Sequence, residues 1–127
     1  MTDEEFLAAL EGGALPAGAF DHAAHVRAAY LYLKGRGFID GMAAFRANLL
    51  RFAERHGATA KYHETITMAF LAVIHERLHG ERSAVGWPQF AACNPDLFAR
   101  DFLDRYYRPE TLALPRAREV FLLEQRR

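Results

Sequence analysis

Apolar side chains recur at helical spacing through most of the chain. In the stretch from Asp40 to Gly57, Met42, Phe45, Leu49 and Phe52 are three, four and three residues apart. Side chains at such spacings share one face of an α-helix, whereas those of a half-buried strand alternate with a period of two. The pattern therefore predicts an amphipathic helix over this stretch.

A second apolar stripe predicts a helix from about Ala60 to Leu78, which should be the longest and most buried in the molecule. Gly80 lies just beyond it, and glycine commonly ends a helix. We expect its apolar side to face the core. That side comprises Ile66, Phe70, Val73, Ile74 and Leu78.

Capping residues mark the remaining helices. Thr2 or Asp3 can cap a first helix, and Asp21 a second, because their side-chain oxygens can accept from the free N–H groups of a first helical turn. The pair Asn94-Pro95 gives the same signal, with proline at the first helical position. These signals predict helices from Asp3 to Leu10, from His22 to Lys34 and from Asn94 to about Tyr107, a short helical turn at residues 87–90, and a last helix that opens at Leu114.

No segment shows convincing strand periodicity between hairpin turns, so the fold class should be all-α. A chain of 127 residues can enclose one hydrophobic core, and 51% hydrophobic with 25% charged residues is typical of a soluble globular protein. We expect a single domain, residues 1–127, built as one helical bundle of four to six helices.

Charge and hydropathy disfavour nucleic acid and membrane as partners. Sixteen basic and sixteen acidic residues cancel, so the chain lacks the global positive field that attracts nucleic acid. The first residues are acidic, and no apolar run approaches the roughly 20 residues of a membrane span.

With one cysteine, Cys93, no internal disulfide can form, so we expect a cytoplasmic protein in which this thiol is buried.

Three of the six histidines fall on predicted inner faces. At roughly 100° per residue, His22 and His25 lie on or beside the apolar stripe of the second helix, and His63 lies at the centre of the stripe that ends at Leu78. The other three histidines lie at helix ends or opposite a stripe. We therefore expect His22, His25 and His63 to point inward.

Buried imidazoles need partners, and one shared metal ion would satisfy all three. Two histidines three residues apart on one helix, with a third from a neighbouring helix, can converge on an ion and leave an open position for water or substrate. The sequence thus predicts a divalent metal site at His22, His25 and His63. Zinc, iron or nickel fits these ligands, as does copper, and the sequence does not distinguish between them. The alternative is that each histidine is a separately hydrogen-bonded core residue.

Three residues near His63 are candidates for proton transfer or for orienting a water molecule. Glu64 is a fourth ligand, a general base or a solvated carboxylate. Tyr62 is a second candidate for handling protons. Thr67 either orients a water molecule or donates to the backbone carbonyl four residues earlier.

Arg77 falls close to the inner face of the helix that ends at Leu78. A guanidinium there needs a carboxylate or a path to water. We expect an ion pair with Asp101 or Asp104, with a clamp on a substrate carboxylate as the alternative.

Three segments carry a family resemblance: residues 20–27 (FDHAAHVR), residues 61–67 (KYHETIT) and residues 94–97 (NPDL). Together they resemble a group of small, uncharacterised bacterial helical proteins, which implies a bacterial single-domain protein. In ligand type alone, the histidines are also similar to the three-histidine metal bundles of the DinB-like family.

Three functions are compatible with these residues. The first is a metal-dependent enzyme that acts on a small-molecule substrate, with Glu64 or Tyr62 handling protons. The second is a non-catalytic helical module that binds a partner or a second copy of itself through the region from Trp87 to Phe90. The third is metal-free binding of a small ligand in a pocket of the bundle.

Overall fold

The computed structural model describes residues 1–83 and 85–125, and this part of the chain is helical without any strand. The predicted all-α class is confirmed. The described residues form seven α-helices and four short 3-10 helices, more than the four to six predicted, because the chain after residue 86 divides into short pieces. The elements are α1 (Asp3–Gly12), η1 (Ala17–Ala19), α2 (His22–Arg36), α3 (Phe38–Arg55), η2 (Thr59–Lys61), α4 (Glu64–Leu78), α5 (Trp87–Cys93), η3 (Pro95–Phe98), η4 (Phe102–Arg105), α6 (Pro109–Leu112) and α7 (Pro115–Glu119).

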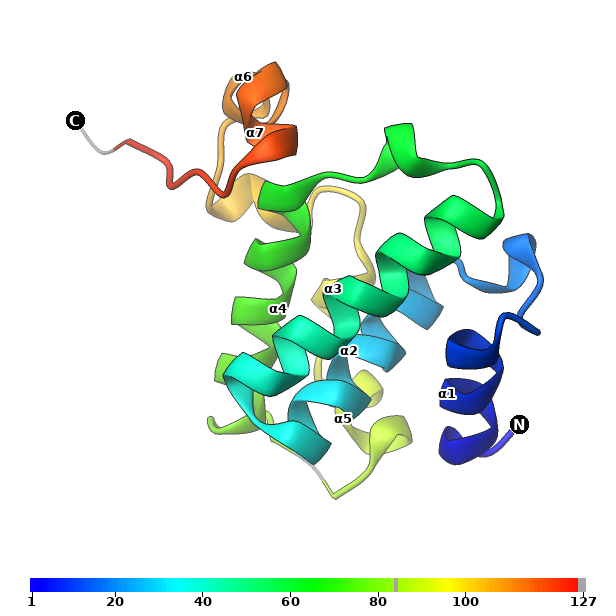
Figure 1. Ribbon diagram of the computed structural model, residues 1–127. Coiled ribbons are helices and arrows are strands. Elements are labelled where there is room, and N and C mark those ends of the chain that lie inside the picture. Colours follow the sequence, from blue (N-terminus) through cyan, green and yellow to red (C-terminus); the bar gives the residue numbers. More distant parts are fainter. Residues whose placement is uncertain (84, 126–127) are drawn as a thin grey trace.

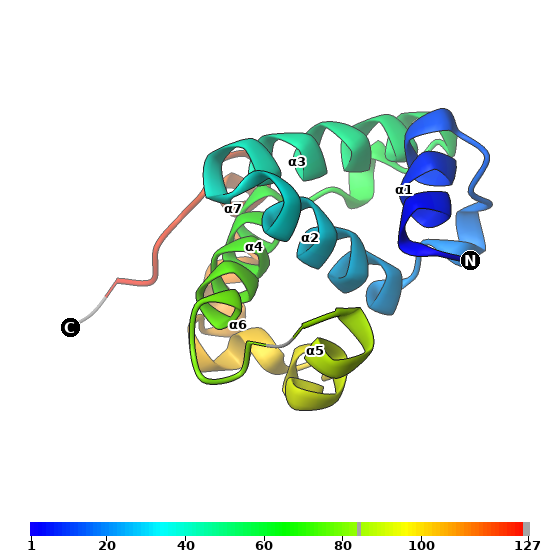
Figure 2. The ribbon, with the colours of Figure 1, turned by 90° about the horizontal axis from the view of Figure 1, so that it is seen from below.

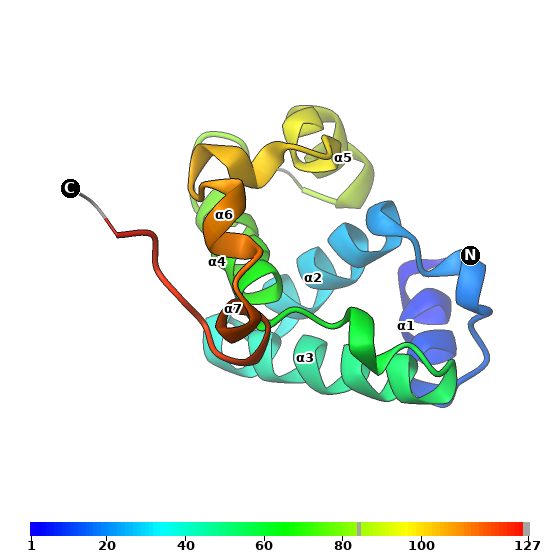
Figure 3. The same ribbon diagram turned by 90° about the horizontal axis from the view of Figure 1, so that it is seen from above.

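Helix α2 packs against both α3 and α4, and α3 also contacts α4, so these three helices enclose the centre of the molecule (Figure 1). Seen from above, α3 runs along one side from α4 and α7 to α1 (Figure 3). Seen from below, α5 lies on the side of α2 away from α3 (Figure 2). None of the described helices is both long enough and apolar enough to cross a membrane.

Two glycines set the geometry between α2 and α3. Gly37 ends α2 and begins α3 with a φ of 82°, a conformation that glycine adopts without strain. Gly41 lies where the two helices cross: a Cβ atom there would stand 2.7 Å from the carbonyl oxygen of Tyr32. The close approach of the two backbones therefore requires a residue without a side chain.

The local signals at the first two helix starts are confirmed. Thr2 accepts from the N–H of Glu5, and Glu5 accepts in turn from the N–H of Thr2, which completes a capping box at α1. Asp21 accepts from the N–H of Ala24 at the start of α2. Helix α2 continues to Arg36, two residues beyond the predicted end.

The helix predicted from Ala60 to Leu78 starts later than expected. Residues Thr59–Lys61 form a separate 3-10 turn, and α4 begins at Glu64 with His63 in extended conformation before it. Helix α4 has 15 residues, so the 18-residue α3, and not α4, is the longest helix.

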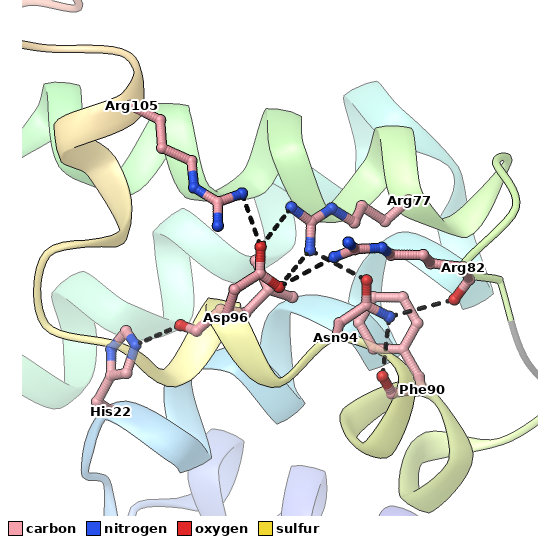
Figure 4. A network of polar contacts seen from close by, with 8 residues as sticks. His22, Arg77, Arg82, Phe90, Asn94, Asp96 and Arg105 are labelled. Atoms are coloured by element: carbon pink, nitrogen blue, oxygen red, sulfur yellow. Dashed lines mark hydrogen bonds and ion pairs between the residues drawn. The ribbon is translucent and has the colours of Figure 1, made fainter.

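The long helix predicted from Asn94 to Tyr107 is wrong, since η3 and η4 replace it. The Asn94 side chain does not cap a helix. It is fully buried, donates to the carbonyls of Phe90 and Arg82, and accepts from Arg77 (Figure 4). Because these contacts satisfy its amide, Asn94 fixes the chain between α5 and η3 and does not cap the predicted α-helix.

Arg77 pairs with Asp96, and not with Asp101 or Asp104 as predicted. Its two terminal nitrogens bind the two carboxylate oxygens at 2.7 and 2.9 Å. Arg82 and Arg105 reach the same carboxylate at 3.2 and 2.8 Å, so three guanidinium groups surround one acid (Figure 4). Hydrogen bonding from Arg77 lowers the pKa of Asp96 to about 2. The cluster joins α4, the loop after it, η3 and η4.

The side chains of the α5 region are partly buried against α2. Phe90 is buried and Trp87 is partly buried, and both rings pack near Tyr30 of α2. Pro88 and Gln89 between them are exposed, so the contact surface from Trp87 to Phe90 stays a prediction. Cys93, predicted to be buried, is exposed at the end of this short helix.

The C-terminal residues attach to α4. Helix α7 packs on α4, and the buried hydroxyl of Thr65 donates to the carbonyl of Val120 at 2.9 Å and accepts from the N–H of Leu122 at 3.1 Å. After Leu122 the described C-terminal residues run away from α4 (Figure 1).

Candidate functional site

His63 caps a helix and both of its ring nitrogens are occupied. Nδ1 accepts from the N–H of Ile66 at 3.1 Å, and Nε2 donates to the carbonyl of Leu112 at 2.8 Å. These two bonds fix the neutral ring as the Nε2–H tautomer. A metal ion bound to His63 would have to displace one of these two hydrogen bonds. The bonds connect the start of α4 to α6.

His22 also has a backbone partner. Its Nε2 donates to the carbonyl of Leu97 at 2.9 Å, and its ring meets Phe70 edge-on with a centroid distance of 5.3 Å (Figure 4). The residue is exposed overall, although its ring forms part of a small cavity wall. This histidine therefore connects α2 to η3.

The expected convergence of His22, His25 and His63 on one ion is not what the structure shows. Within residues 1–83 and 85–125, no group of three His, Cys, Asp or Glu side chains is placed to hold a metal ion. The physical reason is the later start of α4: His63 lies before the helix in extended backbone and does not project from its inner face.

His25 differs from the other two histidines. It is partly buried on α2 and makes no side-chain hydrogen bond within the described residues, while its ring lies edge-on to Phe20 at a centroid distance of 4.1 Å. Burial, helped by the positive charge that His22 can carry, lowers the pKa of His25 to about 4. At neutral pH this imidazole is therefore uncharged and has one donor and one acceptor nitrogen without a protein partner.

Two adjoining cavities meet at His25. One has a volume of about 90 Å³ and lies between α2, α3 and α4, and the other has a volume of about 400 Å³ and extends toward η1 and η2. His25, Leu49, Ile66 and Thr67 belong to the walls of both. Because the exposed Ala17 and Lys61 line the larger cavity, it reaches the surface.

The walls are mainly apolar, with few polar groups. The smaller cavity is lined by His22, His25, Val26, Ala29, Phe45, Leu49, Ile66, Thr67, Phe70, Leu71 and Ile74. The larger is lined by Ala17, Phe20, His25, Leu49, Phe52, Ala53, His56, Ala58, Lys61, Tyr62, His63, Ile66 and Thr67. An apolar pocket with a few well-placed polar groups is typical of small-molecule sites.

Thr67 lies beside His25 in both walls. Its hydroxyl donates to the carbonyl of His63 at 2.8 Å, which is the backbone bond given as one of its two predicted roles. Because a hydroxyl oxygen can still accept a hydrogen bond, Thr67 remains able to bind a donor in the cavity.

Tyr62 and Glu64 form a hydrogen-bonded chain with Arg46 at the edge of the larger cavity. The phenol donates to Oε1 of Glu64, and Nε of Arg46 donates to the same oxygen at 2.9 Å. Partial burial opposes ionisation of Glu64, but the bonds from Arg46 and Tyr62 outweigh it and lower the pKa of Glu64. Burial, together with Glu64, raises the pKa of Tyr62 to about 12. A catalytic role for Glu64, Tyr62 or Thr67 stays a prediction.

Several wall residues were not singled out as functional from the sequence. Phe20 and Phe52, whose ring centroids are 4.8 Å apart, form one side of the larger cavity, and Lys61 stands at its mouth. Phe20 directly precedes the cap residue Asp21 and Phe52 belongs to an apolar stripe, so both carry a packing signal. Neither pattern distinguishes a side chain that fills the core from one that lines a cavity.

Comparison of the chain with family models, with curated proteins and with solved structures finds no match. The resemblance of the histidine segments to small bacterial helical proteins therefore stays a prediction.

Proposed function

We propose that this protein binds a small, largely apolar molecule in the cavities between α2, α3 and α4, without a metal ion. The observation that carries the proposal is the unpaired imidazole of His25 in the wall that both cavities share. A partly buried polar group without a protein partner is costly unless water or a ligand satisfies it. Among the described residues no side-chain nitrogen or oxygen is both fully buried and without a partner, so the ring nitrogens of His25 are open to the cavity, where a polar atom of a bound molecule can pair with them.

The size and lining of the larger cavity support this proposal. Its volume of about 400 Å³ falls within the range of roughly 300–1,000 Å³ that is common for ligand pockets. Aromatic and aliphatic side chains of Phe20, Leu49, Phe52 and Ile66 supply apolar contact, which is the main source of affinity for such ligands. His25 and Thr67 supply the few polar contacts that orient a ligand.

The acid–base properties of the site favour binding over catalysis. A general base works best when its pKa is near the operating pH, and the pKa of His25 is about 4. Glu64 is held as a carboxylate by Arg46 and Tyr62, and the pKa of Tyr62 is about 12. Each of these groups is therefore poorly matched to proton transfer at neutral pH.

The contacts of the histidines argue against the metal-dependent alternative. His63 uses both ring nitrogens, and His22 uses one, in bonds to protein backbone. An ion held by all three histidines would require at least one of the two bonds of the His63 ring to break, either the cap on Ile66 or the bond to the Leu112 carbonyl. For this reason we place His25 alone at the centre of the site, as a hydrogen-bonding group.

A fluorescence titration with N-phenylnaphthylamine, a neutral apolar probe, tests the proposal. The wild-type chain should bind it with enhanced emission. The Leu49→Trp variant should lose about tenfold or more in affinity for the probe, about 1.4 kcal/mol. Leu49 lies in the wall that both cavities share, so the larger tryptophan ring would occupy space inside them.

Leu50→Trp is the matched control, since the neighbouring Leu50 lines neither cavity. This variant should keep the wild-type affinity, and circular dichroism checks that both variants are folded. Absence of probe binding to the wild-type chain, or an equal loss in both variants, would show that the cavities do not bind ligands.

A further inference from the structure

The larger cavity is charged at its mouth and apolar inside. Among the described residues that line it, Lys61 is an exposed cation, and no aspartate or glutamate contributes to the wall. Lys61 also has no ion-pair partner among residues 1–83 and 85–125. Its ammonium group is thus available to a ligand.

A second cation strengthens the positive potential at this point. The guanidinium of Arg118 donates to the carbonyls of Ala60 and Tyr62, on either side of Lys61, at 3.0 and 3.1 Å. Glu64 is the acid bonded to Tyr62, and Arg46 compensates its charge at 2.9 Å. The segment that carries Lys61 is therefore bordered by positive charge, with its bonded carboxylate already paired.

The inner part of the cavity has the opposite character. Phe20, Leu49, Phe52 and Ile66 present rings and alkyl groups, and the neutral His25 contributes the polar group at the junction of the two cavities. A ligand that satisfies the whole cavity would place a hydrocarbon body among these side chains and an anionic group at the mouth.

We propose that the ligand is a carboxylate with a hydrocarbon body, whose charged group is bound by Lys61 at the mouth of the larger cavity. The assignment rests on the proposed function and adds the chemical class of the ligand. A carboxylate suits a single ammonium group, which acts as a point charge, whereas a phosphate is commonly bound by forked guanidinium donors or several backbone N–H groups.

The expected contribution of Lys61 is small because the residue is exposed. Ion pairs in such positions change an equilibrium constant by roughly 1.4-fold to fivefold and weaken with salt. The measurement must therefore isolate the coupling between the carboxylate and Lys61 from the much larger effect of the hydrocarbon.

Displacement of N-phenylnaphthylamine by octanoate and by octanol provides that comparison. Both competitors have the same chain length, and only octanoate carries a charge. In the Lys61→Gln variant, octanoate should lose roughly 1.4-fold to fivefold in affinity relative to octanol, and in Lys61→Glu it should lose more. Arg100→Gln is the matched control, because Arg100 is exposed and lines neither cavity, and it should leave the ratio unchanged.

Ionic strength gives an independent readout on the wild-type chain. Raising the salt from about 0.01 M to about 1 M shortens the screening length from roughly 30 Å to roughly 3 Å. The affinity of the wild-type chain for octanoate relative to octanol should therefore fall toward the value measured for Lys61→Gln. Octanol affinity serves as the internal control for folding.

The outcomes separate this inference from the proposed function. One outcome is that octanol displaces the probe normally while the ratio of octanoate affinity to octanol affinity is the same in wild type, Lys61→Gln and Lys61→Glu. In that case the carboxylate assignment is wrong and the cavity still binds ligands. If neither competitor nor the probe binds to the wild-type chain, the proposed function fails and the carboxylate assignment fails with it.

Discussion

Replacing His25 with phenylalanine should weaken the dependence of stability on pH. The pKa of His25 is about 4 in the folded protein, against roughly 6.5 for an unperturbed histidine in the unfolded chain. Between these values the unfolded chain binds a proton that the folded chain does not. The free energy of unfolding should therefore be highest above about pH 6.5 and fall as the pH is lowered toward 4.

The magnitude follows from the difference in pKa. At roughly 1.4 kcal/mol for each pKa unit, the full difference for His25 corresponds to about 3 kcal/mol lost between neutral pH and pH 4. That is a large part of the stability of a typical small domain. In His25→Phe this contribution is absent, so the variant should lose about 2–3 kcal/mol less than wild type over the same range.

Urea unfolding followed by circular dichroism at several pH values between about 7.5 and 4.5 measures the effect. Burial and the neighbouring His79 also lower the pKa of His75, but this contribution is common to both proteins and cancels in the comparison. Leu50→Phe, which changes no titratable group, should keep the wild-type slope. Equal slopes in wild type and His25→Phe would refute the buried, neutral state of His25.

Three further substitutions test the contacts that hold the site in place. Gly41→Ala should lower the unfolding free energy by about 2 kcal/mol or more in urea titrations, because its Cβ would stand 2.7 Å from the Tyr32 carbonyl oxygen; wild-type stability would contradict the close approach. Thr65→Val should cost about 2 kcal/mol and speed amide exchange at Leu122, since two hydrogen bonds are lost; unchanged exchange would show that these bonds do not hold the C-terminal segment. Asp96→Asn should lower the thermal midpoint, with a loss of about 2 kcal/mol, because three guanidinium groups lose their shared carboxylate; an equal or higher midpoint would mean that the cluster does not stabilise the fold.

Local signals were sufficient for much of the fold. The capping box of Thr2 and Glu5 and the cap at Asp21 involve residues three apart, so the sequence alone contains both partners. The apolar stripes of α2, α3 and α4 likewise depend on spacing within one helix. For this reason the all-helical class and most helix positions could be predicted.

The role of His63 depends on a distant residue. Its Nε2–H bond reaches the carbonyl of Leu112, 49 positions later, and its Nδ1 caps α4. Histidine is an uncommon cap residue, so an apolar stripe that includes it extends the predicted helix one turn too far. The predicted metal site relied on His63 projecting from the inner face of that helix, and the later helix start leaves His63 at the cap position instead.

Asn94 shows the same difficulty in another part of the chain. The pair Asn94-Pro95 has the local signature of a helix start, but Arg77 and the carbonyls of Phe90 and Arg82 bind the amide. The cavities are harder still to predict, because an unfilled space depends on how three helices pack and not on the pattern of any one of them.

Nuclear magnetic resonance with octanol tests the central claim most directly, because it locates a bound molecule by its contacts. If the cavities between α2, α3 and α4 bind apolar ligands, nuclear Overhauser effects should connect the octanol chain to the methyl groups of Leu49 and Ile66. Contacts limited to exposed methyl groups such as those of Ile39 and Leu123, with none to Leu49 or Ile66, would contradict the account.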